Sequence, residues 1–98
     1  MTKFKYTVGD HVIERDIETS EDGNGKVKDV LKYIAKTENQ SLKVAFINRI
    51  SEQQMGVDII NPDGGSCYVE SDTKVSAIEI YDSNMWRKVS LIVDGYVG

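Results

Sequence analysis

The chain has 98 residues, of which 40% are hydrophobic and 29% are charged. This length fits a single domain over residues 1–98, and this composition excludes an intrinsically disordered tail. No apolar run approaches the roughly 18 residues that a membrane-spanning helix requires, so we expect no membrane partner.

The net charge is −4, and it is unevenly distributed along the chain. Residues 1–49 hold nine Lys/Arg and eight Asp/Glu, whereas residues 50–98 hold three Lys/Arg and eight Asp/Glu. Such counts commonly mean a solvated surface of mixed sign. Contact with nucleic-acid phosphates requires a coherent basic face, so direct DNA binding is disfavoured. The acidic second half instead favours a basic partner protein.

Cysteine usage and the N-terminal residues bear on the compartment. The single cysteine, Cys67, cannot form an internal disulfide. The first six residues alternate polar and apolar side chains and lack the apolar core of a signal peptide. We therefore expect a reducing, cytoplasmic location, which for a viral protein would be the host cytoplasm.

The first quarter of the chain predicts a β-hairpin followed by a loop. Apolar and polar residues alternate over residues 4–8, which indicates a half-buried strand. Gly9 and Asp10 predict a tight turn, because glycine permits the bend and the aspartate side chain can bond backbone amides within it. We expect a second strand over residues 11–17, and a loop over the polar, glycine-containing residues 18–25.

The next segment, residues 26–36, fits either a helix or a strand. Four apolar residues have the i, i+3, i+4, i+7 spacing of an amphipathic helix with lysines opposite. These residues are Val27, Val30, Leu31 and Ile34. A glycine-rich approach with a weak cap and a high content of valine, tyrosine and isoleucine favour a strand. A helix near residues 26–37 makes the fold α+β, with one helix on a curved sheet, whereas a strand makes it all-β.

The middle of the chain predicts a strand and then a hairpin. Alternating side chains indicate a strand over residues 42–46. Strands over residues 57–60 and 67–70 flank Asn-Pro-Asp-Gly-Gly at positions 61–65, which is the strongest turn signal in the chain.

The C-terminal third predicts a second hairpin. Residues 75–81 are rich in β-branched and aromatic side chains, residues 82–84 indicate a turn, and residues 87–93 alternate again. The chain is therefore expected to be mainly β, forming a small antiparallel barrel or a curved sheet.

Three segments in the first half of the chain share a family pattern. They are Val-Gly-Asp-His-Val at 8–12, Gly-Asn-Gly-Lys-Val-Lys-Asp-Val-Leu at 23–31 and Lys-Val-Ala-Phe at 43–46. They resemble the opening strands of SH3-like barrels of the KOW and Tudor type. The resemblance implies that Gly25 lets the chain leave a loop and enter a strand. It also implies a binding module for RNA polymerase, ribosomal or chromatin components, or nucleic acid.

Catalytic and metal-binding patterns are not found in the sequence. His11 is the only histidine and lies in the first hairpin, so we interpret it as a surface residue. One histidine and one cysteine cannot supply a four-ligand zinc site, and Cys67 is expected to be a packed, inert thiol. No phosphate-binding glycine loop is present. We therefore expect no enzymatic activity, no metal and no cofactor.

The function that these observations favour is that of a small acidic binding protein. It would modulate or inhibit a basic, DNA-binding or transcription-related partner by presenting carboxylates where that partner holds phosphates, as small viral proteins do. Trp86 follows a turn and suits an interface anchor. The expected partner-binding residues are Glu14, Asp16, Glu18, Asp58, Asp63, Glu70, Asp72, Glu79, Asp82 and Trp86.

Two other interpretations remain open. In the first, the chain is a KOW- or Tudor-like accessory module that contacts nucleic acid or a ribonucleoprotein through a lysine patch. That patch would consist of Lys26, Lys28, Lys32 and Lys36. In the second, the chain is a structural subunit that forms a homo-oligomer through its edge strands.

Overall fold

The computed structural model describes residues 1–64 and 72–96, which form six strands and one helix. In chain order these are β1 (Thr2–Val8), β2 (His11–Ile17), α1 (Gly23–Glu38), β3 (Leu42–Asn48), β4 (Gln54–Ile60), β5 (Thr73–Asp82) and β6 (Met85–Val93). All strand pairs are antiparallel, and the sheet order is β2-β1-β6-β5-β3-β4. Strands hold 53% of the described residues and the helix 18%, so the prediction of a mainly β fold is confirmed.

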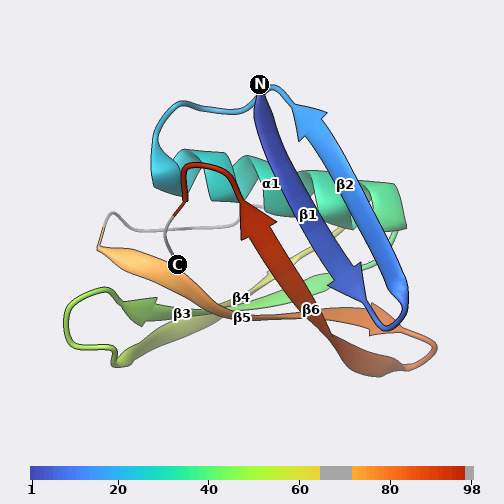
Figure 1. The fold of residues 1–98 in the computed structure, drawn as a ribbon. Helices are drawn as coiled ribbons and strands as arrows, with labels where there is room; N and C mark the ends of the chain where they lie inside the picture. The colour runs from blue at the N-terminus through green and yellow to red at the C-terminus, as the bar shows by residue number, and fades with distance from the viewer. Residues whose placement is uncertain (65–71, 97–98) are drawn as a thin grey trace.

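The sheet bends because β6 changes its partner along its length. Its first four residues, Met85–Lys88, pair with the end of β5, and Val89–Val93 pair with β1. β1 and β2 therefore cross steeply over the strands β3, β4 and β5, as Figure 1 shows. Within the described residues β2 and β4 are the two edges of the sheet. Of the two predicted forms, the described residues adopt the curved sheet.

The ambiguous segment is a helix that begins earlier than the sequence suggested. All four residues with helical spacing are fully buried, since α1 lies across the inner face of the bent sheet. Asp22 caps the helix, because its carboxylate accepts a hydrogen bond from the backbone N–H of Gly25 at 2.7 Å. The expected loop over residues 18–25 is therefore wrong from Gly23 onward. Residues 23–31, for which the resemblance implied a strand, are helical.

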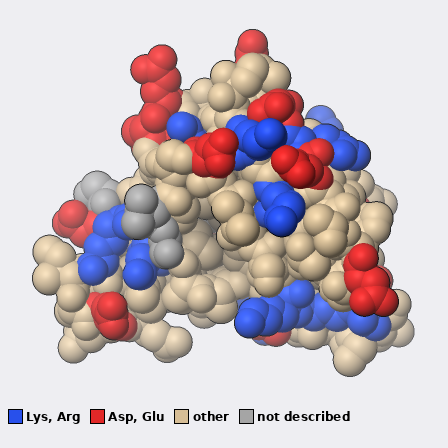
Figure 2. Space-filling view, viewed as in Figure 1, with Lys and Arg blue, Asp and Glu red and all other residues tan. Residues whose placement is uncertain are grey.

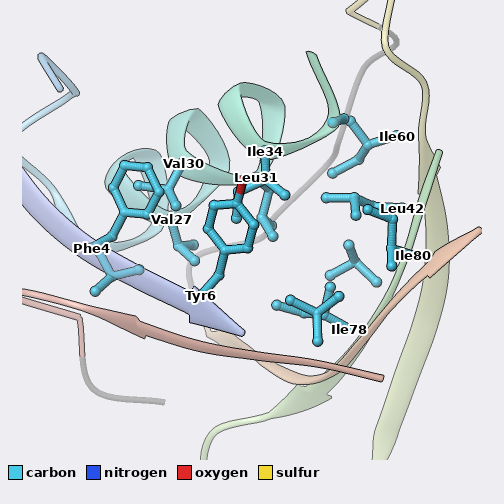
Figure 3. Close-up of a cluster of buried hydrophobic side chains, with 14 of the residues drawn as sticks. Phe4, Tyr6, Val27, Val30, Leu31, Ile34, Leu42, Ile60, Ile78 and Ile80 are labelled. Atoms are coloured by element: carbon cyan, nitrogen blue, oxygen red, sulfur yellow. The ribbon is translucent and has the colours of Figure 1, made fainter. Parts of the chain in front are cut away.

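The core fills the space between α1 and the inner face of the sheet (Figure 3). The helix contributes one apolar stripe, and every strand next to it contributes inward-facing residues at alternate positions. The largest fully buried side chains are Tyr6, Phe4, Leu31, Ile34, Leu42, Ile60, Ile80, Val27, Val30 and Val44.

The predicted turns are confirmed where the structure describes them. Gly9 has a φ of +57° in the β1–β2 turn, and Ser83 and Asn84 have φ values of 52° and 65° between β5 and β6. Two-residue hairpin turns require such left-handed conformations. The backbone N–H of Gly64 donates to the carbonyl of Asn61 at 3.1 Å, which closes the turn after β4. The strand expected over residues 67–70 lies outside the described residues.

Tyr6 brings a polar hydroxyl group into this core. Its side chain is fully buried, and its hydroxyl donates a 2.7 Å hydrogen bond to Oε2 of Glu38 in the last turn of α1. Burial, and then this bond and the negative charge of Glu38, raise the pKa of the Tyr6 phenol well above the usual tyrosine value. The bond therefore holds the C-terminal end of α1 against β1 only while the phenol stays protonated.

We expect Tyr6→Phe to lower the free energy of unfolding by about 1.5–3 kcal/mol, the range for hydrogen bonds to charged groups. The raised pKa adds a dependence on pH. Because the unfolded phenol ionises at its ordinary value and the folded phenol does not, stability is lost as the pH rises through about 10. Urea unfolding at neutral and alkaline pH measures both effects. Above pH 10 the free energy of unfolding should fall more steeply with pH for the wild type than for Tyr6→Phe. An equal dependence on pH in the two proteins would contradict this assignment.

The two glycines at the start of α1 give opposite predictions for the same substitution. A Cβ at Gly25 would lie 2.7 Å from Oδ2 of Asp22 and 2.8 Å from Cβ of Ser20, whereas a Cβ at Gly23 would lie 3.8 Å from Cδ1 of Tyr96. We expect Gly23→Ala to stabilise the protein by up to about 1 kcal/mol, since alanine favours a helix. Gly25→Ala should destabilise it, because the added methyl group displaces the cap. Equal stabilisation by both in thermal unfolding would refute this.

Candidate binding surface

The outward face of the β5–β6 hairpin carries a compact group of aromatic and charged side chains. Strand pairing places Tyr81 opposite Trp86 and Glu79 opposite Lys88, and Lys43 of β3 lies opposite Glu79 on the other side. Because paired residues share a face of the sheet, these five side chains share the face that α1 does not cover. We call this group the hairpin surface.

Trp86 is the centre of the hairpin surface. Its ring meets the ring of Tyr81 edge to face, with centroids 5.1 Å apart and an interplanar angle of 87°. The ammonium nitrogen of Lys43 lies 4.6 Å from the Trp86 ring centroid, within the range of a cation–π interaction. Trp86 is half-buried and Tyr81 is 39% exposed. The aromatic pair is therefore held in a fixed orientation and still presents apolar area to solvent.

Exposed apolar residues continue this surface across the sheet. Ala77 of β5, Ala45 of β3 and Val57 of β4 form one cross-strand row. Ile59 shares the face of Val57 on β4, and Met55 lies at the shift of register that precedes them; all three side chains are at least 45% exposed. Scattered apolar residues are common on protein surfaces, but a contiguous group of this kind is typical of an interaction site.

Three of the predicted partner-binding residues belong to the β5–β6 hairpin, but they do not share one face. Glu79 and Trp86 are on the hairpin surface, whereas Asp82 is in register with Met85 on the opposite face. There Asp82 accepts a hydrogen bond from Gln40 at 3.2 Å and forms an ion pair of 3.3 Å with Nε of Arg87. The charge of Asp82 is thus compensated within the hairpin.

The acids predicted on the N-terminal strands face lysines. On β2, Glu14 is in register with Lys5 and Asp16 with Lys3, all on the outward face. Glu14 also forms a 3.6 Å ion pair with Lys3, with both side chains 56% exposed. Exposed pairs of this kind contribute little to stability, but they cancel the local field that a basic partner would meet.

The remaining predicted acids lie in separate places. Glu18 and Asp63 line one hollow beside α1, together with Lys32 and Lys36. Asp72 is exposed in the turn before β5. Asp58 is half-buried on β4, on the same face as the buried Ile60. Glu70 lies outside the described residues.

Acidic and basic side chains are therefore intermixed on the part of the surface that the structure describes. Strands β2 and β4, which carry three of the predicted acids, are opposite edges of the sheet. Figure 2 shows red and blue side chains interleaved over the face in view. On that face the carboxylates do not gather into one region.

The predicted lysine patch is divided by the helix. Lys28, Lys32 and Lys36 follow one another at four-residue intervals on one side of α1. Lys26 is not part of this row. Its side chain extends to Gly95, where an added Cβ would lie 2.7 Å from the Lys26 Nζ. Three of the four lysines thus form a row.

The described residues do not form a metal-binding cluster. Over residues 1–64 and 72–96, no three His, Cys, Asp or Glu side chains come together as a metal-binding group. His11 is exposed at the start of β2, as expected. Cys67 lies outside the described residues. The described helix is too short and too polar to span a membrane.

Of the five residues of the hairpin surface, reasoning from the sequence named Trp86 and Glu79 but not Tyr81, Lys88 or Lys43. A two-residue turn at Ser83 and Asn84 would have placed Tyr81 opposite Trp86, so this pair could have been found. Lys43 could not have been predicted from the sequence, because its position beside Trp86 depends on the pairing of β3 with β5, which are far apart in the chain.

Comparison with protein-family models, with curated proteins and with solved structures finds no match for this chain. The surfaces of the molecule therefore carry the functional interpretation alone.

Proposed function

We propose that this chain is a non-enzymatic binding module that recognises a basic partner protein through the hairpin surface. The observation that supports this most directly is the position of Lys43 over the Trp86 ring. The Trp86 ring binds an ammonium group here, and a lysine or arginine of a partner that displaced Lys43 would make the same cation–π contact. Tryptophan, tyrosine and arginine also dominate the binding energy of protein interfaces.

Charge supports the same kind of partner. The net charge is −4, and residues 50–98 hold eight Asp/Glu against three Lys/Arg. Within the hairpin surface Glu79 lies between Lys43 and Lys88, so the negative field comes from the chain as a whole. Such a field steers a basic protein toward the surface and weakens with salt.

The proposed partner is a DNA-binding or transcription-related protein, whose nucleic-acid site the module would occupy or block. Mimicry of a phosphate backbone requires a run of carboxylates, whereas four of the predicted acids, Glu14, Asp16, Glu79 and Asp82, lie next to Lys or Arg residues. We therefore assign recognition to an aromatic anchor with an acidic neighbour. The overall negative charge accelerates the encounter.

A second candidate function rests on the lysine row of α1. Lys28, Lys32 and Lys36 on one side of a helix could contact the phosphates of a nucleic acid or ribonucleoprotein. Glu18 and Asp63, which share a hollow with Lys32 and Lys36, oppose that contact. The hairpin surface is therefore the preferred site.

Affinity capture followed by mass spectrometry, at low and moderate salt, tests the first proposal. We expect the wild type to capture a basic protein at low salt. The amount captured by Trp86→Ala should be lower by more than about tenfold, as is typical when an interface anchor is removed. Ile92→Ala is the matched control, because Ile92 is 64% exposed and faces outward on the same strand. It should behave as the wild type.

A second variant separates binding from folding. Glu79→Lys reverses one charge of the hairpin surface without removing an aromatic ring, and it should also weaken capture. The circular dichroism of each variant confirms that it is folded. Capture that survives both Trp86→Ala and Glu79→Lys, or that is indifferent to salt, would overturn the proposal.

A gel shift with single- and double-stranded nucleic acid tests the alternative. A shift by the wild type that is lost when Lys28, Lys32 and Lys36 are changed to Gln would support the lysine row. The hairpin-surface proposal expects no shift.

A further inference from the structure

Lys43 reaches the Trp86 ring across an intervening strand. β3 and β6 are not neighbours in the sheet, because β5 lies between them. Two strand spacings amount to about 10 Å, so the Lys43 side chain has to extend over β5. Its Nζ then lies 4.6 Å from the ring centroid. The ammonium group therefore occupies the face of the ring that a cation from outside would use.

This contact passes over a nearer group of opposite charge. Glu79 stands directly opposite Lys43 on one side and opposite Lys88 on the other. Side chains that are directly opposite in a sheet begin about 4.5–5.5 Å apart, which is close enough for an ion pair. The ion pairs formed among the described residues nevertheless do not include Lys43 or Glu79. The Lys43 ammonium is thus held by the ring, and the Glu79 carboxylate stays beside it.

We propose, on the basis of the function assigned to the hairpin surface, that Lys43 is an internal competitor for the Trp86 ring and that an arginine of the basic partner displaces it. Exchange of one ammonium group for another on the ring gains little, so a lysine of the partner has no advantage over Lys43. A guanidinium group has one, because it is planar, more weakly hydrated than an ammonium group and stacks on aromatic faces.

Glu79 gives arginine a second advantage. Glu79 is two positions before Tyr81, which is opposite Trp86, so Glu79 and Trp86 are diagonal neighbours on one face. Diagonal neighbours lie roughly 7–8 Å apart, within reach of long side chains. A guanidinium group stacked on the ring can therefore donate two parallel hydrogen bonds to the carboxylate, a geometry that an ammonium group lacks. The hairpin surface thus favours arginine over lysine.

Occupation of the ring by Lys43 also limits the affinity for any cation. A cation–π contact at an exposed site is weak, so the ring exchanges between states with and without Lys43. A ligand that requires the vacant ring binds more weakly in proportion to the fraction of molecules in which the ring is vacant. From the usual strength of exposed cation–π contacts, this occupation should weaken binding about threefold to sixfold. Lys43 therefore acts against weak, non-specific cations.

Hexa-arginine and hexa-lysine peptides, which carry the same side-chain charge, test this competition. Trp86 is the only tryptophan of the chain, so its fluorescence reports binding at the ring. The wild type should bind hexa-arginine more tightly than hexa-lysine. Lys88→Gln is the matched control for Lys43→Gln, because both remove one positive charge opposite Glu79. Lys43→Gln should bind both peptides about threefold to sixfold more tightly than Lys88→Gln does.

Two further measurements test the displacement and the role of the carboxylate. The Cε protons of Lys43, next to the Nζ over the indole ring, should resonate upfield in nuclear magnetic resonance spectra of the unbound protein. Hexa-arginine should return them to the ordinary lysine position. Glu79→Gln should lower the affinity for hexa-arginine more than that for hexa-lysine. Circular dichroism shows that each variant is folded.

The outcomes separate this competition from the proposed function. Equal affinities of Lys43→Gln and Lys88→Gln would mean that net charge alone matters. That result, equal binding of the two peptides by the wild type, an equal effect of Glu79→Gln on both peptides or unmoved Cε signals would each overturn the competition by Lys43 or the preference for arginine, and would leave the hairpin surface as the binding site. Absence of binding by the wild type and by Lys43→Gln alike would overturn the proposed function as well.

Discussion

The partner change within β6 is the constraint on which the rest of the structure depends. Between Lys88 and Val89 the strand leaves β5 and continues beside β1. A flat sheet could not surround a single helix, whereas a sheet bent at this strand has a concave face that α1 fills. The apolar stripe of the helix meets inward residues from both halves of the sheet, such as Phe4 of β1 and Leu42 of β3. Burial of this stripe is the main stabilising contribution, as is usual for small domains with one core.

One helix covers one face of the sheet, and this sets where recognition can occur. The outward face of β4, β3, β5 and the start of β6 has no element over it in the described residues (Figure 1). Apolar side chains on that face remain exposed after folding, so their burial by a partner would still be favourable. The hairpin surface belongs to this face, so the uncovered side of the sheet is where a partner can be recognised.

The sequence predicted what depends on local periodicity and failed where distant segments meet. Alternation was sufficient for β1 and β3, and Gly9 and Asn84 marked turns because they tolerate left-handed conformations. The start of α1 was misplaced because Gly23 and Gly25 are typical of loops, and the Asp22 cap that compensates for them is recognised only once the helix is known. No local pattern places Lys43 over Trp86, because the order of the strands in the sheet brings these two residues together.

Cross-strand pairing also explains why net charge alone gives an incomplete picture of function. In a hairpin an acid on one strand stands next to residues of the other, so the turn between two strands decides whether its charge is compensated. The β1–β2 turn brings Glu14 to Lys3, and the β5–β6 turn brings Asp82 to Arg87. Acids such as Asp82 are therefore compensated at short range by a neighbouring strand, and they contribute to the net charge only at a distance. Long-range attraction can then select the sign of a partner, but the specific contact has to come from side chains such as Trp86 and Tyr81, whose exposed area no neighbouring strand covers.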